Sequence, residues 1–156
     1  MKIRTDFVTN SSSSSFIVVF KTKKDFDNKE ELLRNKFWLS ESYIKTICDD
    51  IDNNKVSRKK VIDTLKETFK ADAEYNFAWR SMKWEEAREY IRTKEFREKV
   101  NKYVNDMLNQ YKDKLPDRGY YYAIIEYGDD DGDYFSELEH HIMPRLPFVL
   151  KRISHH

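Results

Sequence analysis

Residues 119–156 form the last quarter of the chain and read G-Y-Y-Y-A-I-I-E-Y-G-D-D-D-G-D-Y-F-S-E-L-E-H-H-I-M-P-R-L-P-F-V-L-K-R-I-S-H-H. Within this stretch, residues 120–127 are apolar or aromatic on both faces except for one glutamate, which is typical of a central β-strand. Residues 148–154 predict a final strand. Between the two, a helix is predicted over residues 134–143, with Asp133 as its N-cap. This β-loop-α-β order is typical of a domain that combines a sheet with helices.

The other end of the chain adds two strands. Residues 1–7 alternate between apolar and polar side chains, which predicts a half-buried strand. Residues 14–20 end in the run F-I-V-V-F, which is apolar on both faces and predicts a central strand. The sequence therefore predicts an α+β fold. We expect a small, mostly antiparallel or mixed sheet, with strands near 1–7, 14–20, 120–127 and 148–154, packed on a largely helical middle, residues 27–115.

Asp27 and Glu30 have the spacing of a capping box, so a helix is expected to run from there to about residue 39. Its buried face is expected to include Leu33, and Trp38 is a further candidate for that face. A second helix is predicted over residues 40–52, because its apolar side chains recur at helical spacing.

A third helix is predicted to begin after Ser57. Residues 83–115 carry a further apolar stripe at helical spacing, which fits either one long helix or two helices joined near Thr93. The aromatic residues around Trp79 and Trp84 have no clean period, so they either fill the core between helices or form a contact surface.

Composition limits the classes of protein that fit. A length of 156 residues fits a single domain over residues 1–156. The net charge of +1 gives no overall field that would attract nucleic acid, so a nucleic-acid partner is not expected. Cys48 is the single cysteine, which fits the reducing cytoplasm. No apolar run approaches the roughly 18 residues of a membrane span, so we expect no membrane association.

Side chains with the chemistry of metal ligands gather in the last quarter of the chain. All 4 histidines lie there, and an acidic loop over residues 129–133 precedes the predicted helix. Glu137 and His141 are four residues apart, which places them on one face of an α-helix. Imidazole and carboxylate groups together are a usual ligand set for zinc and related ions.

We therefore expect a site for a divalent metal such as zinc or manganese, with ligands drawn from Glu137, His141, His155, His156, Asp129 and Asp131. This site requires strands 120–127 and 148–154 to run parallel, because only then do both end at the same edge of the sheet. The competing interpretation is an acidic turn that caps a helix, with histidines at the end of the chain.

The serine run is a second candidate polar site, formed by Ser12, Ser13 and Ser14. If the strand that follows it runs antiparallel to the two C-terminal strands, the serines reach the same sheet edge. The whole opening segment, M-K-I-R-T-D-F-V-T-N-S-S-S-S-S-F, resembles the N-terminal segment of uncharacterised bacterial proteins from low-GC Gram-positive genomes. The resemblance covers about the first 20 residues. It implies a bacterial source and no particular activity.

Recognised catalytic motifs are absent from the sequence. It contains no phosphate-binding loop, no nucleophile elbow and no H-E-x-x-H zinc motif. The best prediction is a cytoplasmic, non-enzymatic binding or interaction protein that recognises another protein or a nucleotide-like ligand. The alternative is a metal-dependent, hydrolase-like enzyme, in which a C-terminal carboxylate acts as general base on a metal-bound water.

Overall fold

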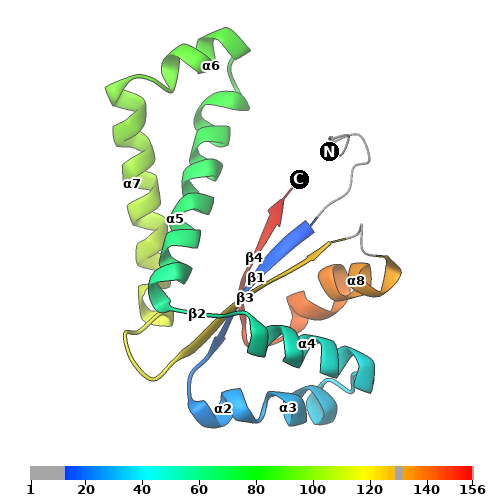
Figure 1. Cartoon of the computed structure of the whole chain (residues 1–156). Coiled ribbons are helices and arrows are strands. Elements are labelled where there is room, and N and C mark those ends of the chain that lie inside the picture. The colour runs from blue at the N-terminus through cyan, green and yellow to red at the C-terminus, as the bar shows by residue number, and fades with distance from the viewer. Residues whose placement is uncertain (1–12, 129–131, 156) are drawn as a thin grey trace. The chain divides into compact units, whose positions relative to one another are not determined.

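The computed structural model describes residues 13–128 and 132–155 (Figure 1). Residue contacts divide the chain into two compact units, which are described one at a time. The sheet unit comprises Met1–Ser57 and Arg118–His156, and the helical unit comprises Arg58–Asp117. The single domain expected from the length of the chain stays a prediction.

The sheet unit is built on four strands, β1 (Ser13–Phe20), β2 (Lys55–Val56), β3 (Tyr121–Gly128) and β4 (Val149–His155). Their order across the sheet is β2-β3-β1-β4, and every neighbouring pair is antiparallel. The predicted α+β class is therefore confirmed, as are the strands expected near 14–20, 120–127 and 148–154. The strand expected near 1–7 lies outside the described residues, and the short β2 was not predicted.

The directions of β3 and β4 meet the condition set by the sequence analysis. Both strands are antiparallel to β1, which lies between them, so they run parallel to each other. The connection between them is long enough for a crossover that contains a helix. Ser13 at the start of β1 is in register with Gly128 at the end of β3 and with His155 at the end of β4. The serine run and the two strand ends therefore share one edge of the sheet.

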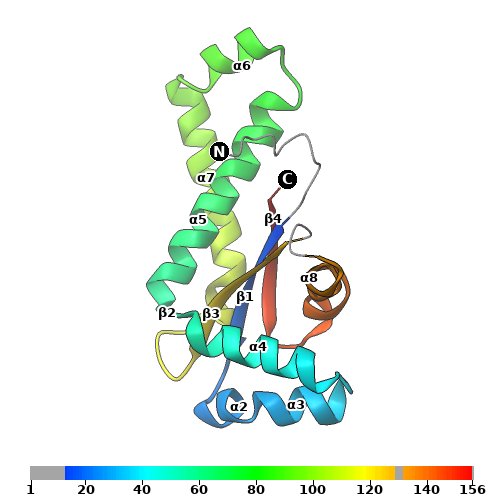
Figure 2. The ribbon, with the colours of Figure 1, turned by 45° about the vertical axis from the view of Figure 1, so that its right-hand side comes forward.

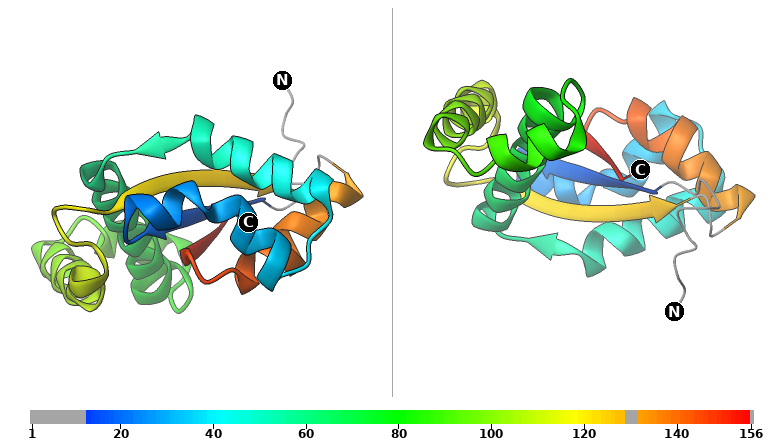
Figure 3. Two further views of the ribbon diagram at one scale, coloured as in Figure 1. Left: turned by 90° about the horizontal axis from the view of Figure 1, so that it is seen from below. Right: turned by 90° about the horizontal axis from the view of Figure 1, so that it is seen from above.

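One face of the sheet carries the hydrophobic core of this unit. Phe16 and Val18 of β1 point into it, together with Ile125 of β3. Helical segments from the N-terminal and the C-terminal parts of the chain cover this face, as Figures 2 and 3 show. These segments are α2 (Lys23–Asp27), α3 (Lys29–Lys36), α4 (Glu41–Asn53), α8 (Asp133–Glu137), η4 (Leu138–Ile142) and η5 (Met143–Arg145).

α4 follows the sequence pattern closely. Its apolar residues recur every three or four positions, and Ile44, Ile47 and Ile51 are buried against the sheet. The helix expected over 27–39 is wrong in detail, because α3 spans only Lys29–Lys36 and a separate helix, α2, precedes it. Thr22 caps α2 by accepting a hydrogen bond from the backbone N–H of Asp25, and Asp27 ends α2 instead of capping a longer helix.

The helix predicted over 134–143 also differs in detail. Asp133 is its first residue, and Gly132 holds the N-cap position at a φ of 104°. The α-helical hydrogen bonding then gives way to a π-helix, η4, and to a 3₁₀ turn, η5, which contains Pro144. A π-helix has more residues per turn than an α-helix, so it changes which side chains face inward.

The helical unit contains α5 (Arg58–Glu74), η1 (Tyr75–Trp79), α6 (Trp84–Tyr90), α7 (Lys94–Tyr111) and η2 (Lys112–Lys114). α5 and α7 run side by side (Figures 1 and 2). The stripe over 83–115 is thus two helices, and Thr93 caps the second by accepting a hydrogen bond from the Phe96 N–H at 3.1 Å. In the described part of the chain, no helix has the length and apolar character needed to cross a membrane.

Replacing Thr93 with alanine tests this cap. Loss of the hydrogen bond to the first turn of α7 should lower the free energy of unfolding by about 1 kcal/mol, measured by urea denaturation. Thr64 is the matched control, because its hydroxyl only donates to the carbonyl of Lys60 within α5. Thr64→Ala should leave stability nearly unchanged. Equal losses in both variants would contradict the assignment of Thr93 as a cap.

Candidate functional site

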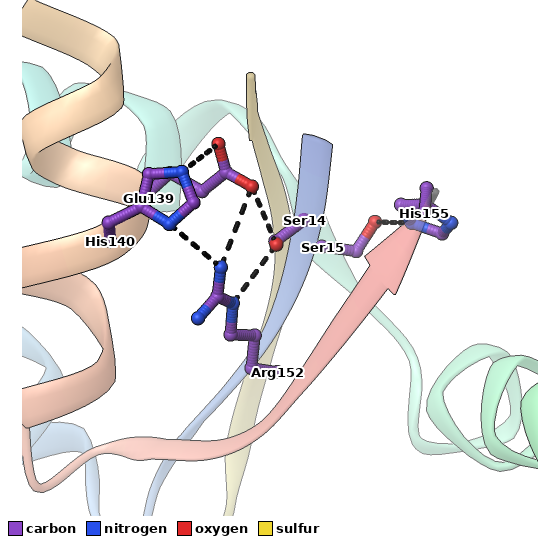
Figure 4. A network of polar contacts seen from close by, with 6 residues as sticks. All are labelled: Ser14, Ser15, Glu139, His140, Arg152 and His155. Atoms are coloured by element: carbon purple, nitrogen blue, oxygen red, sulfur yellow. Dashed lines mark hydrogen bonds and ion pairs between the residues drawn. The ribbon is translucent and has the colours of Figure 1, made fainter. Parts of the chain in front are cut away.

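A buried polar network lies at the edge of the sheet that the sequence analysis singled out (Figure 4). The Ser14 hydroxyl of β1 donates to Oε1 of Glu139 at 2.8 Å and accepts from Nε of Arg152 at 3.0 Å. Ser14 and Glu139 are fully buried. Glu139 comes from η4 and Arg152 from β4, so the hydroxyl joins three separate elements.

The charge of Glu139 is matched mainly by Arg152, whose Nη2 lies 3.7 Å from Oε1. The same Nη2 donates to Nδ1 of His140 at 3.2 Å, so the His140 proton is on Nε2. Nε2 in turn lies 3.4 Å from Oε2 of Glu139, and this carboxylate oxygen has no hydrogen-bond partner among the described residues. A buried carboxylate is costly unless it is paired, so Arg152 and Ser14 are required to keep Glu139 in place.

Replacing Glu139 with alanine tests the role of the network. The variant leaves the guanidinium of Arg152 without its counter-charge and the buried hydroxyl of Ser14 without its acceptor, so stability should fall by about 3–5 kcal/mol. Glu137→Ala is the matched control, since Glu137 is exposed two residues earlier. It should change stability by less than about 0.5 kcal/mol in the same denaturant titration. A small effect at Glu139 would show that the network does not hold these elements together.

A second polar cluster lies on the opposite face of the same sheet edge. Oγ of Ser15 lies 2.8 Å from Nε2 of His155 and 3.4 Å from Oε2 of Glu126. The Glu126 oxygen also lies 3.7 Å from that same ring nitrogen. In a catalytic triad the acid holds the opposite nitrogen of the imidazole, which orients the ring and stabilises its positive charge. This cluster therefore lacks the geometry of a serine nucleophile with its base.

The ligand set expected for a metal is not brought together among the described residues. Residues 13–128 and 132–155 contain no group of three or more His, Cys, Asp or Glu residues that could hold a metal ion. Among the described residues, Glu137, His141 and His155 do not form such a group. Glu137 and His141 are exposed, while Glu139 faces inward. The inward face of this segment is formed by Leu138, Ile142 and Met143, which pack in the core of the sheet unit.

The other predicted site residues have different outcomes. Asp129, Asp131, His156 and Ser12 lie outside the described residues, so their part in any site stays a prediction. Ser13 is placed at the shared edge as expected, paired through its backbone with β3 and β4. Ser14 also reaches that edge, but its buried hydroxyl is committed to Glu139 and Arg152. No observation within the described residues favours the metal-dependent hydrolase.

Trp38 is a site residue that sequence reasoning missed. The prediction that Trp38 belongs to a buried helix face is wrong, because its side chain is 84% exposed. Its backbone has a φ of 55°, and it is the non-glycine residue with positive φ in the described chain. The position follows the C-cap of α3, where glycine is usual because it takes this conformation without a steric penalty. The signal available in the sequence was the lack of any glycine between α3 and α4.

A pocket of about 600 Å³ lies beside this segment, between the end of β1, the start of β4 and helices α2 and α3. Apolar side chains in its lining come from Val19, Phe20, Leu32, Pro147 and Phe148. Asn35 also lines the pocket, and its backbone carbonyl accepts a hydrogen bond of 2.8 Å from Nε1 of Trp38. This hydrogen bond links the exposed indole to α3, which forms one wall of the pocket.

The aromatic residues of the helical unit are divided between core and surface. Trp79 and Phe77 pack against the buried residues Phe96 and Val100, as expected for core filling. Trp84 is 59% exposed, and the guanidinium of Arg88 lies 5.0 Å from the centre of its ring. Trp84 therefore already has an internal partner for one ring face, in contrast to Trp38.

Cys48 contributes no reactive thiol. It is buried in the core of the sheet unit, and this burial raises the pKa of the thiol to about 11. The thiolate is the reactive form, so its fraction in the folded protein should stay small until the pH approaches that value. Burial also raises the pKa of Tyr127 strongly, and the hydrogen bond of 2.7 Å from its hydroxyl to Asp50 adds to this effect.

Thiol labelling tests the environment of Cys48. At pH 8 the folded protein should react with a disulfide reagent much more slowly than the urea-unfolded protein, because the thiol is both buried and protonated. Raising the pH should speed the reaction of the folded chain only as the pKa of about 11 is approached. Rapid labelling of the folded protein at pH 8 would contradict the burial of this residue.

Comparison of the chain with protein-family models, with curated proteins and with solved structures found no match. The fold and the two sites define an α+β protein with a buried polar network at one end of its sheet and an apolar pocket with an exposed tryptophan at the other. Function is therefore inferred from the residues of this chain alone.

Proposed function

We propose that this chain is a non-enzymatic binding protein that recognises another protein, with Trp38 at the centre of its contact surface. A bacterial source and a cytoplasmic location, expected from the opening segment and the single cysteine, belong to the same proposal. The single observation that carries it is the combination, at Trp38, of a strained backbone and an almost fully exposed indole.

Both properties of Trp38 are unfavourable for folding alone. A left-handed conformation costs a bulky residue about 1–2 kcal/mol, and the exposed ring gains little from burial in return. Strain of this kind is typically found at functional positions, where the surrounding structure maintains it. A binding role explains why the chain has tryptophan at a position where glycine would be more stable.

The chemistry of tryptophan fits a contact residue. Tryptophan is enriched among the few interface residues that supply most of the binding energy in protein complexes. The bond from Nε1 to the Asn35 carbonyl holds the indole in one orientation before any partner arrives. A side chain that is already fixed loses little conformational entropy on binding, which favours affinity. The adjacent apolar pocket extends the surface that a partner would cover.

Replacing Trp38 with glycine separates binding from folding. Glycine relieves the strain at φ 55°, so stability should rise by about 1 kcal/mol in a denaturant titration. To measure binding, short random peptides displayed on phage are selected against the full chain, and the selected peptides are synthesised. Their affinity for Trp38→Gly should fall by about 2 kcal/mol, or roughly thirtyfold in Kd.

Trp84→Ala is the matched control, because Trp84 is also exposed but contacts Arg88. It should change the Kd of the same peptides by no more than about twofold. Equal losses in the two variants would point to nonspecific binding by exposed tryptophan. Peptides that bind Trp38→Gly as tightly as the unaltered chain, or a selection with no binder that needs Trp38, would contradict the proposal.

A further inference from the structure

We infer that the pocket beside Trp38 takes one apolar anchor side chain from a partner segment that carries both an acidic and a basic residue next to that anchor. This inference rests on the proposed function and adds the chemistry of the partner. It depends on three features of the pocket: its apolar floor, the charges on its rim, and the fixed position of its walls.

The floor of the pocket is formed by aromatic and aliphatic side chains. Phe20 at the end of β1 and Phe148 before β4 have their ring centroids 4.8 Å apart, and Leu32 of α3 and Pro147 also line the pocket. A volume of about 600 Å³ lies within the range of pockets that enclose ligands. Such a floor favours an apolar group over a polar one, because contact removes apolar surface from water on both sides.

The rim of the pocket carries charges of both signs. Lys21 and Lys36 supply two positive charges, and Asp25 and Glu31 supply two negative ones. All four side chains are exposed, and none of them forms an ion pair with another described residue. A balanced rim does not favour a polyanion such as a nucleic acid, because Asp25 and Glu31 would repel phosphate.

Apart from Lys24, the charges on the same helices that do not line the pocket are paired within the chain. Lys23 pairs with Asp27 at 2.7 Å, and Arg34 pairs with both Glu30 and Glu41 at 2.8 and 2.6 Å. The contrast between paired charges outside the rim and unpaired charges on it points to a partner that supplies the missing counter-charges. Charge complementarity therefore requires a partner segment with both an acidic and a basic residue.

The walls of the pocket are fixed before binding. The backbone N–H of Val19 donates to the carbonyl of Phe148 at 2.8 Å, which joins the end of β1 to the residue before β4. Phe20 also packs edge-on against Phe26 of α2, with ring centroids 5.5 Å apart. A preformed pocket fits one anchor residue of a partner protein. The preoriented indole of Trp38 would then contact the partner residues on either side of that anchor.

Filling the pocket tests the inference. Asn35→Phe places a ring on the exposed pocket side of α3 without removing the backbone carbonyl that holds Trp38. It should weaken the phage-selected peptides by at least about tenfold. Lys24→Phe is the matched control, because it adds the same ring on α2 outside the pocket lining, and it should leave the Kd within about twofold.

Changes in the peptide and in the rim complete the test. Replacing the single aromatic or aliphatic anchor of each peptide with alanine should cost roughly tenfold or more, and this measurement needs no protein variant to fold. Glu31→Lys and Lys36→Glu should each weaken binding by about two- to fivefold, with smaller effects at high salt.

The outcomes separate this inference from the proposed function. If Asn35→Phe binds the peptides normally while Trp38→Gly does not, Trp38 contacts a partner but the pocket takes no anchor, and the inference is overturned. If the selected peptides lack a required apolar residue, or tolerate both charge reversals, it is overturned as well. If Trp38→Gly binds normally, the proposed function itself fails.

Discussion

The buried carboxylate of Glu139 is the constraint on which the sheet unit depends. A charge removed from water has to be matched where it lies, and only a hydrogen-bonded cation and donor can do so. Arg152 and Ser14 supply these groups from the two strands β4 and β1. The network therefore holds η4, β1 and β4 in one arrangement. It also explains part of the serine run, since position 14 needs a side chain small enough to be fully buried and polar enough to bond both partners.

The two ends of the sheet are chemically opposite. At the end that carries Ser14, Glu139 and Arg152 are paired with each other, although Oε2 of Glu139 has no hydrogen-bond partner among the described residues. Ser15, His155 and Glu126 contact one another on the other face. At the far end, the charges around the pocket have no counter-charge among the described residues, and the indole of Trp38 is exposed to solvent. Exposed charges without a counter-charge are available to a partner, whereas a buried ion pair chiefly holds the fold together.

Residue types alone were a poor guide to the site, because they do not give its geometry. Serine, histidine and glutamate do converge at the sheet edge, but Glu126 and Ser15 share one nitrogen of His155, so the geometry of a triad is missing. The spacing of Glu137 and His141 predicts a shared helix face, but that face is exposed, and Glu139 is the side chain that is buried. Local hydrogen-bonding geometry decides which of several neighbouring polar residues meet, and a pattern of residue types does not record it.

The sequence by itself determined the α+β class, three of the strands and the cores of α4, α5 and α7, because apolar periodicity directly reflects which side of an element is buried. It also predicted that Ser13 and Ser14 reach the edge where β3 and β4 end, on the condition that β1 runs antiparallel to both, and only the structure shows that direction. Only the tertiary structure decided that Arg152 and Glu139 form a pair, since the pair depends on how η4 packs beside β4. It alone decided that Trp38 is exposed and strained. That outcome depends on where α3 has to stop for α4 to reach the sheet, and no local pattern around Trp38 encodes it.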